Sequence, residues 1–458
     1  MARKVFISFL GTNNYIQCHY LINGKISAPT RFVQDALINY YCTDWSNTDE
    51  IIIFGTDGKN GSKKKNWLDQ GQDRVSENSV LENKGLYGIL KSKSLKVRLN
   101  DITLIPEGFS EIEIWRIFKI VFEKIQTGDE IFFDVTHAFR SIPIFSTILL
   151  NYASLLKDTR LMAIHYGAFE KLGHVPDVKN IPLEERIAPV LDLMPLVSLQ
   201  DWTVAARNFI EYGKADKIHL LLEEKYSKLL EESRGGDTQA RSLQSIDKML
   251  LAHTESIISN KMDNIIKGSN LNSALENVRN TESVLAPAFW PLIKKIESKL
   301  HDFSQNDLKN IFAATEWCIN HELYQNAYSI LLEGTISLML SEIGEEYSGK
   351  SQLIECKRGT LIHAANFLKN NKSMEDCIKQ FRISENMTEH SETLHCVIEK
   401  IWSILNPNIA CNIVALNSKR NSYMHAGTGT NPLGSFTNLK EDLKIYCAEL
   451  KTYFTQNI

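Results

Sequence analysis

Arginine, asparagine and histidine lie close together near the carboxyl end of this 458-residue sequence, in the stretch RNSYMHAG. In a helix Asn421 and His425 share a face because they are four residues apart, whereas Arg420 lies roughly 140° around the axis. The imidazole, whose ordinary pKa is about 6.5, can exchange protons near neutral pH. The guanidinium stays charged and can stabilise negative charge on a phosphoryl group. These groups suit RNA cleavage by attack of a ribose 2′-hydroxyl on the neighbouring phosphorus, with Asn421 in support.

The motif is short, and its context has to support it. A chain with 12 histidines and 51 lysines and arginines will place an arginine and a histidine five residues apart by chance. One histidine and one arginine also make a small site. Two copies that meet across a symmetric dimer would double the groups available.

Composition limits the classes of protein and of site. The eight cysteines form no CxxC pair, and no His/Cys cluster has zinc spacing, so we expect no metal and no prosthetic group. The net charge is −4, from 51 basic and 55 acidic side chains, so any contact with nucleic acid must come from a local site. No apolar stretch is long enough to span a bilayer. We therefore expect a cytoplasmic protein without a membrane partner.

The elements that must position these residues fall into two halves. The first ~170 residues alternate strand and helix patterns, which is typical of a parallel α/β sheet. Strands are expected at 4–10, 49–56, 96–106 and 159–169, a strand running into a turn at 129–143, and helices at 29–42, 109–125 and 144–156. From about residue 182 the strand signal disappears, and helical periodicity continues almost to the end. The predicted fold is an α/β domain at 1–178, a helical connector at 179–300 and a helical domain at 301–458.

Three polar loops follow the expected strands: LGTNNY, GTDGKNGSKKKN and DVTHAFRSIP. Ligands of open parallel sheets bind beyond the carboxyl ends of the strands. Backbone N–H groups, hydroxyls, amides and cations in these loops suit phosphates and bases. None of the loops is a standard mononucleotide motif. Tight turns and solvated lysines use the same residue types, so a purely structural role stays open.

Taken together, these segments resemble the CRISPR-associated CARF–HEPN ribonucleases of type III CRISPR systems, over nearly the whole chain. The motifs that carry the resemblance are FISFLGTNNY, FGTDG…NW, FFDVTHAFRSIP, LQDWTVAARNFIEYGKAD, EWCINHELYQNAYSILLEG and the RxxxxH motif in RNSYMHAG. Each piece alone is weak to moderate, but their order in one chain is specific.

The resemblance implies a Rossmann-like CARF domain at 1–178 that binds cyclic oligoadenylate, with tetra-adenylate favoured over hexa-adenylate. Binding would activate a HEPN domain at 301–458 that cuts single-stranded RNA in antiviral defence. It also implies a homodimer or higher oligomer, in which paired CARF domains share one ligand pocket and paired HEPN domains share one active site. By motif match Arg420 and His425 carry catalysis, with Asn421 in support. The activator contacts implied by the resemblance are Gly11, Thr12, Asn13, Thr56, Thr136, His137 and Arg140.

Two alternatives stay open. In one, the α/β half senses a nucleotide and the helical half binds DNA or a protein partner. That requires an exposed basic recognition helix, and the sequence indicates none, because the basic cluster SKRN adjoins the RxxxxH motif itself. In the other, the CARF half degrades its own activator as a ring nuclease, for which Thr12 and His137 offer suitable groups.

Overall fold

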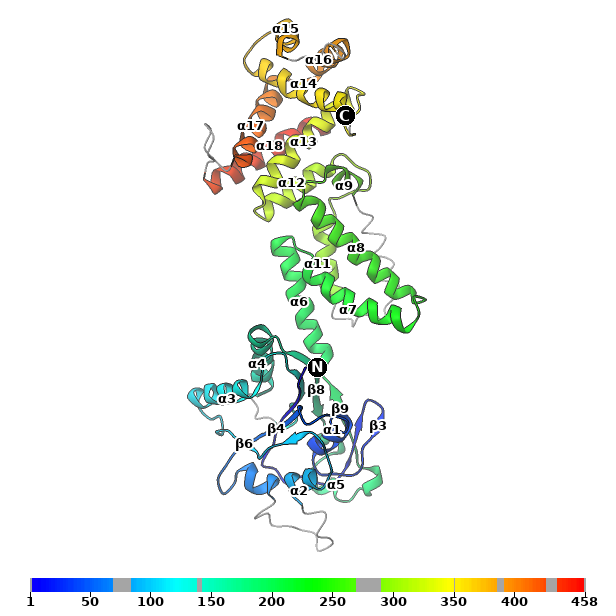
Figure 1. The fold of residues 1–458 in the computed structure, drawn as a ribbon, viewed down its shortest axis with the longest axis vertical. Coiled ribbons are helices and arrows are strands. Elements are labelled where there is room, and N and C mark those ends of the chain that lie inside the picture. Colours follow the sequence, from blue (N-terminus) through cyan, green and yellow to red (C-terminus); the bar gives the residue numbers. More distant parts are fainter. Residues whose placement is uncertain are drawn as a thin grey trace. The chain divides into compact units, whose positions relative to one another are not determined.

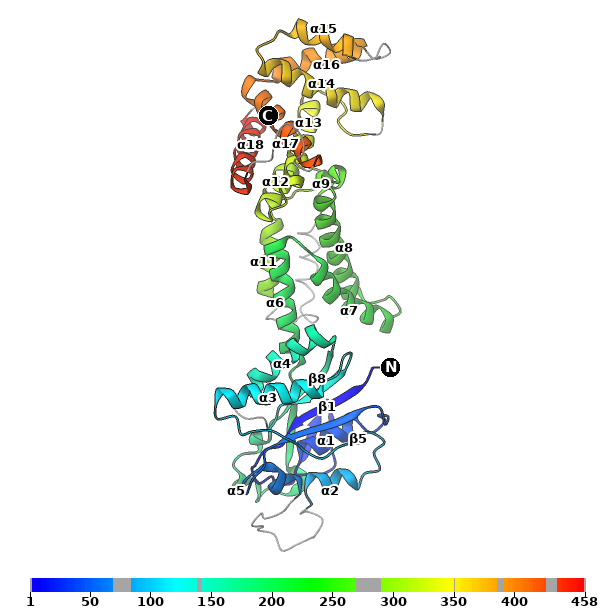
Figure 2. The same ribbon diagram turned by 60° about the vertical axis from the view of Figure 1, so that its left-hand side comes forward.

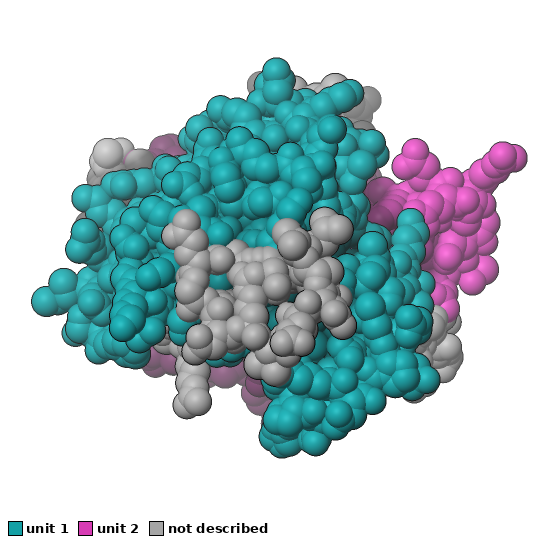
Figure 3. Space-filling model, turned by 90° about the horizontal axis from the view of Figure 1, so that it is seen from below, with its two compact units in different colours: residues 1–198 teal, residues 199–458 magenta. Residues whose placement is uncertain are grey.

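The structure is a computed structural model that describes residues 2–68, 84–137, 142–268, 290–349, 351–384, 391–425 and 435–456. The chain forms two compact units, residues 1–198 (unit 1) and 199–458 (unit 2), coloured separately in Figure 3. Unit 1 is built on a sheet, and unit 2 is helical (Figure 1). The described helices include none that is both long enough and apolar enough to cross a membrane.

The centre of unit 1 is a set of parallel strands. Their order across the sheet is β8 (Arg160–Gly167), β7 (Glu130–Asp134), β1 (Lys4–Phe9) and β4 (Glu50–Gly55), followed by β5 (Arg98–Leu99) and β6 (Thr103–Leu104), which both pair with β4. From β1 the chain goes to β4 on one side and later to β7 on the other. The strand order therefore reverses beside β1, which is where open α/β sheets bind ligands.

Alternate side chains of β1 enter two separate apolar layers, because successive residues of a strand point to opposite faces. Phe6 packs with α1 (Val33–Tyr41) and α2 (Leu86–Lys91) on one face. Val5, Ile7 and Phe9 pack with α3 (Glu111–Lys124) and α4 (Ile142–Lys157) on the other. Figure 2 shows the two pairs of helices on opposite sides of the sheet. Burial on both faces explains why β1 and β4 are continuous apolar runs.

The sheet is mixed, which corrects the expectation of a parallel sheet. β9 (Ile187–Asp192) pairs antiparallel with β8 and parallel with β2 (His19–Ile22), and β2 forms an antiparallel hairpin with β3 (Lys25–Ile26). The expectation that strands end near residue 182 was therefore wrong, because β9 follows it. The expected loop after β4 also differs, since residues 63–67 form the short π-helix η1 (Lys63–Trp67). The short helices η2 (Phe169–Leu172), α5 (Val175–Val178) and η3 (Leu183–Glu185) connect β8 to β9.

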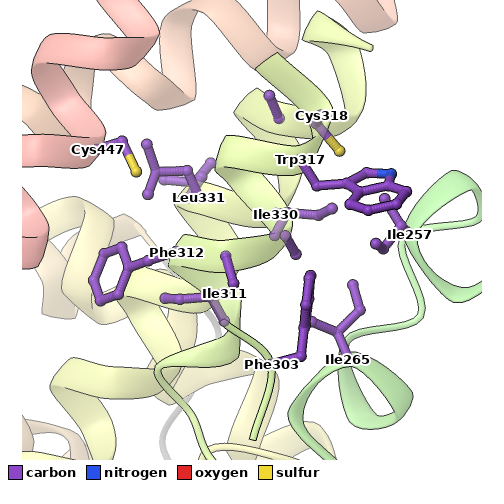
Figure 4. Packing of buried hydrophobic residues seen from close by; sticks show 14 of the residues in the cluster. Ile257, Ile265, Phe303, Ile311, Phe312, Trp317, Cys318, Ile330, Leu331 and Cys447 are labelled. Carbon is purple, nitrogen blue, oxygen red and sulfur yellow. The ribbon is translucent and has the colours of Figure 1, made fainter. Parts of the chain in front are cut away.

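Unit 2 is formed by helices around one apolar core. In chain order they are α6 (Met194–Tyr212, beginning in unit 1), α7 (Asp216–Glu232), α8 (Thr238–Ile258), α9 (Met262–Lys267), α11 (Trp290–Leu300), α12 (Asn310–Asn320), α13 (Tyr324–Glu342), α14 (Gln352–Lys369), α15 (Met374–Ser384), α16 (Ser391–Ile404), α17 (Pro407–Met424) and α18 (Phe436–Gln456). α13 is the central helix and packs against α12, α14, α17 and α18. At Gly334 a Cβ would lie within 2.6 Å of Ile311, so glycine allows α12 and α13 to approach closely. Figure 4 shows the side chains between these two helices.

The predicted order of an α/β part followed by a helical part is confirmed. The unit boundary lies between residues 198 and 199. The core of unit 2 runs without interruption from Trp202 to Phe454, across the expected division at residue 300. The domain limits at 178 and 300 remain predictions.

Candidate active site and ligand pocket

Arg420 is held by a carboxylate on a neighbouring helix. It lies near the carboxyl end of α17, one residue before the last turn, and its Nη2 donates to Oε1 of Glu333 on α13 at 2.9 Å. Arg358 on α14 donates to Oε2 of the same carboxylate at 2.6 Å and to the Glu333 carbonyl at 2.9 Å. The Glu333 carboxylate thus lies between two guanidinium groups. Charge-assisted bonds of this kind fix the direction of a planar guanidinium better than a solvated surface would.

Arg358 is itself immobilised. Its Nη1 donates to Ser337 Oγ at 3.0 Å and to the Tyr347 carbonyl at 2.8 Å. Neither Glu333 nor Arg358 was singled out from the sequence. Glu333 is 87 residues from Arg420 along the chain, so no local pattern relates them. Only the packing of α13, α14 and α17 brings the three groups together.

His425 follows α17 directly and caps its carboxyl end. Its backbone N–H donates to the Asn421 carbonyl at 3.0 Å. Asn421 also accepts a bond from Arg420, with 3.1 Å between Oδ1 and Nη1. The side chains of Asn421 and His425 are exposed. The structure therefore brings the three motif residues together at one helix end, where the side chains of Asn421 and His425 are accessible to solvent.

Tyr423 does not join this exposed group, although it belongs to the same RNSYMHAG stretch. Its ring lies 5.8 Å from that of Tyr328, and its hydroxyl is buried. Burial raises the pKa of Tyr423. The reason is helical geometry, since Tyr423 faces the core while the motif residues lie around the exposed end.

In unit 1 the loop after β1 is tied to η1. The side-chain amide of buried Asn66 donates to the Gly11 carbonyl at 2.8 Å and to the Asn13 carbonyl at 3.0 Å. Thr12 and Asn13 are exposed. The loop therefore has a fixed backbone and presents these two side chains to solvent.

Thr56 is used to fold its own loop. Its backbone N–H donates to Ser62 Oγ at 2.9 Å, and its Oγ1 accepts from the Ser62 N–H at 3.2 Å. Thr56 is buried and does not line the pocket described below. A contact between Thr56 and a ligand stays a prediction.

Thr136 is anchored to the buried end of β7. Its hydroxyl donates to Asp134 Oδ1 at 2.5 Å and accepts from the Gly167 N–H at 2.8 Å. Asp134 also accepts from Ser8 Oγ at 2.7 Å. Burial raises the pKa of Asp134, and these bonds oppose that shift. The network joins the ends of β1, β7 and β8 beneath the expected ligand site.

His137 is buried against Tyr15, with 4.3 Å between the ring centroids. Burial lowers the pKa of His137 to about 4, so the imidazole is neutral at physiological pH. Its Nε2 is buried and has no hydrogen-bond partner among the described residues. An unsatisfied buried nitrogen is unusual in a folded protein.

A pocket of about 200 Å³ lies at this edge of the sheet. Of the predicted contacts, Asn13, Thr136 and His137 line it, whereas Gly11, Thr12 and Thr56 do not. Arg140 lies outside the described residues. The pocket also contains Arg31, Tyr166 and Glu170, which the sequence did not reveal. Tyr166 donates to Glu170 at 2.6 Å, and Arg31 supplies a cation beside the polar wall.

The comparisons with known proteins give the class. A family model described as the second domain of CRISPR-associated protein MJ1674 matches residues 198–307, beginning where the two units divide. This supports a CRISPR-associated protein. A relative of this chain is the CRISPR-associated protein MJ1674 of Methanocaldococcus jannaschii, and the two sequences are 25% identical over 236 residues. The alignment covers 50% of this chain and 32% of that relative, so the chain spans about a third of its length.

Proposed function

We propose that this chain is a CRISPR-associated endoribonuclease of the CARF–HEPN kind, which cuts single-stranded RNA and is activated by cyclic oligoadenylate in antiviral defence. The observation that carries the proposal is the end of α17. There Arg420 is oriented by Glu333, and His425 is exposed on the next turn. A guanidinium and an imidazole on one exposed edge provide charge stabilisation and proton transfer.

The reaction divides between these groups. His425 exchanges a proton with the attacking 2′-hydroxyl or the leaving 5′-oxygen, and Arg420 stabilises the extra charge on the phosphoryl oxygens. Asn421 supports Arg420 through their 3.1 Å contact. The products are a 2′,3′-cyclic phosphate and a free 5′-hydroxyl. A homodimer supplies both copies of each group to one composite site.

The sensor is assigned to the strand-end pocket of unit 1. Its walls combine the Arg31 cation, the Asn13 amide and the neutral His137 ring, a set that suits a phosphate and a base. A pocket of about 200 Å³ in one chain is smaller than a cyclic oligonucleotide. A symmetric pair of such pockets would hold it between two subunits.

The test is incubation of pure full-length protein with end-labelled single-stranded RNA, with cyclic tetra-adenylate, with cyclic hexa-adenylate or with neither. We expect cleavage that depends on an activator and leaves 2′,3′-cyclic phosphate ends. Binding of an activator without cleavage would support the alternative in which unit 2 recruits DNA or a protein partner. The absence of both would reject the proposal.

Degradation of the activator is a second candidate activity, favoured by His137 at the pocket, whose Nε2 has no hydrogen-bond partner in the described part of the chain. A neutral imidazole can accept a proton from an activator 2′-hydroxyl. Chromatography of cyclic tetra-adenylate after incubation would show linear products. His137→Asn should abolish them if the imidazole acts chemically, whereas unchanged turnover would remove this candidate.

A further inference from the structure

Unit 2 contains a cavity that shares no lining residue with α17 or with the sheet pocket of unit 1. It has a volume of about 430 Å³ and lies between α8, α9 and Phe303. This size is in the range of small-molecule sites. All of its lining residues fall within the 198–307 segment that matches the family model. The cavity therefore belongs to the part of the chain whose role the RxxxxH motif does not explain.

The walls of this cavity are mainly apolar, with Ser256 and Asn264 as uncharged polar members. Ile257 of α8, Ile265 of α9 and Phe303 line it and are themselves almost fully buried. Figure 4 shows Ile265 and Phe303 next to one another, with Ile257 nearer Trp317. Such walls favour a flat, apolar body such as a ring.

One lining residue has a buried polar atom without a partner among the described residues. His253 lines the cavity, and its Nε2 is buried without a hydrogen-bond partner among the described residues. The ring packs edge-on against Phe303, with centroids 4.4 Å apart, and against Trp317 at 5.5 Å. These ring contacts give Nε2 no hydrogen bond, so its capacity for one is unused among the described residues.

The charges at the cavity have one sign. Lys248 and Lys267 line it and are exposed, and no carboxylate is among the described lining residues. Two ammonium groups beside an apolar interior attract an anion whose remaining part is apolar.

We propose that this cavity binds a small planar ring compound with an anionic group at one end and a hydrogen-bonding atom at the other. The ring lies between Ile257, Ile265 and Phe303. The hydrogen-bonding atom meets His253 Nε2, and the anionic group meets Lys248 and Lys267. The site is separate from the RNA-cleaving motif and from the sheet pocket.

The probe is 4-hydroxybenzoate, which has a ring, a hydroxyl and a carboxylate in this arrangement. Full-length protein with ¹⁵N-labelled histidine is titrated, and the His253 ring resonance is assigned by its loss in His253→Gln. Benzoate lacks the hydroxyl and phenol lacks the charge. 4-Hydroxyphenyl phosphate distinguishes a phosphate preference from a carboxylate preference. We expect a saturable shift of the His253 resonance with the full probe and weaker binding of benzoate and phenol.

The double variant Lys248→Gln/Lys267→Gln should bind about tenfold or more weakly, because it removes two charge-assisted contacts from exposed positions that do not support the fold. Lys261→Gln is the matched control, since Lys261 is exposed beside the same helices but does not line the cavity. An unshifted His253 resonance at high probe concentration would overturn the proposal. So would equal affinity of the double variant and the control, and His253 would then be a packing residue only.

Discussion

The Nη2 atom of Arg420 lies 2.9 Å from Oε1 of Glu333, and Arg358 occupies the other oxygen of that carboxylate. A single acidic side chain thus orients the guanidinium proposed for catalysis. The Glu333 carboxylate is also paired with a second cation, Arg358, which does not belong to the motif. The arrangement makes Glu333 a positioning residue, with consequences that can be measured.

Replacing Glu333 with Gln should lower RNA cleavage by about 10- to 100-fold, the value of a charge-assisted hydrogen bond that fixes Arg420. Cleavage is measured at saturating activator. Glu316→Gln is the control, because Glu316 forms a comparable 2.8 Å ion pair with Lys451 away from the motif. A purely structural role would lower the melting temperature of Glu333→Gln and leave the rate per folded molecule unchanged.

His425→Ala should reduce RNA cleavage by about 10²–10⁴-fold because it removes the proton-transfer group. Its exposed side chain leaves no cavity, so folding and activator binding should stay near normal. His301→Ala, at a histidine that is 75% exposed outside the motif, is the control. Wild-type cleavage by folded His425→Ala would reject the ribonuclease assignment.

Arg420→Ala should be as severe as the loss of the histidine, unless Arg358 substitutes for the missing charge. The two arginines share one carboxylate, so Arg420→Ala/Arg358→Gln separates these cases. If Arg358 compensates, the double variant is slower than Arg420→Ala. A heterodimer of Arg420→Ala and His425→Ala subunits, assayed in the same way, reports whether one cut needs both copies of each group.

Arg31→Gln should weaken activator binding by about tenfold, since Arg31 is the cation of the sheet pocket. At saturating activator the cleavage rate should recover. Arg98→Gln, which changes an arginine in unit 1 that is 51% exposed and does not line the pocket, should bind normally. Arg140→Ala is predicted to behave like Arg31→Gln. Unchanged affinity in calorimetry would show that the tested arginine is not a ligand contact.

RNA cleavage should survive excess chelator, because the proposed chemistry needs only the imidazole and guanidinium groups. Among the described residues, the carboxylate that contacts Arg420 is that of Glu333, and it is already paired with Arg420 and Arg358. The measurement is the cleavage rate in chelator, with and without added magnesium. Loss in chelator that magnesium restores would contradict the mechanism.

Two histidines of unit 2 should give opposite pH dependence of stability. His219 Nδ1 lies 2.9 Å from Asp247 Oδ2, and this bond raises the pKa of His219, with smaller contributions from Glu223 and Asp216. A raised folded pKa stabilises the fold fully below the unfolded value of about 6.5, and the contribution is lost as pH rises through the folded pKa. His219→Gln should therefore cost most below pH 6 and least at alkaline pH, as measured by thermal unfolding.

Burial lowers the pKa of His253 to about 4. The unfolded chain then binds the proton more tightly, so the free energy of unfolding falls as pH drops from about 6.5 towards 4. In His253→Gln this part of the acid dependence should disappear, whatever the variant's stability at neutral pH. An unchanged slope between pH 4 and 6.5 would show that His253 titrates normally.

The sequence predicted the layout because burial leaves a periodic signal. β1 and β4 read as apolar runs, and the helical half shows i, i+3, i+4 spacing. The mixed edge of the sheet was missed for different reasons. β9 is short and contains Pro189, and its pairing depends on β8 and β2. The β2–β3 hairpin had a usable signal in Asn23-Gly24, whose positive φ angles of 47° and 79° suit a tight turn.

The residues of the candidate active site were likewise predictable only where the signal is local in the sequence. Arg420 and His425 could be found because their spacing is local. Glu333 and Arg358 could not, since both reach Arg420 only through helix packing. The polar pocket was only partly predictable, because loop residues such as Thr56 and Thr136 hydrogen-bond within the fold as readily as with a ligand.

The Asn66 amide, which donates to the Gly11 and Asn13 carbonyls, ties the loop after β1 to the helix η1 that follows β4. The next residue, Trp67, is completely buried, and its indole N–H donates to Asp101 at 2.7 Å. The loop after β1 is therefore linked, through Asn66 and the neighbouring Trp67, to the interior of unit 1. Any molecule that binds at this edge would therefore meet a backbone that is held at the ends of both β1 and β4, and we expect the edge to deform little on binding.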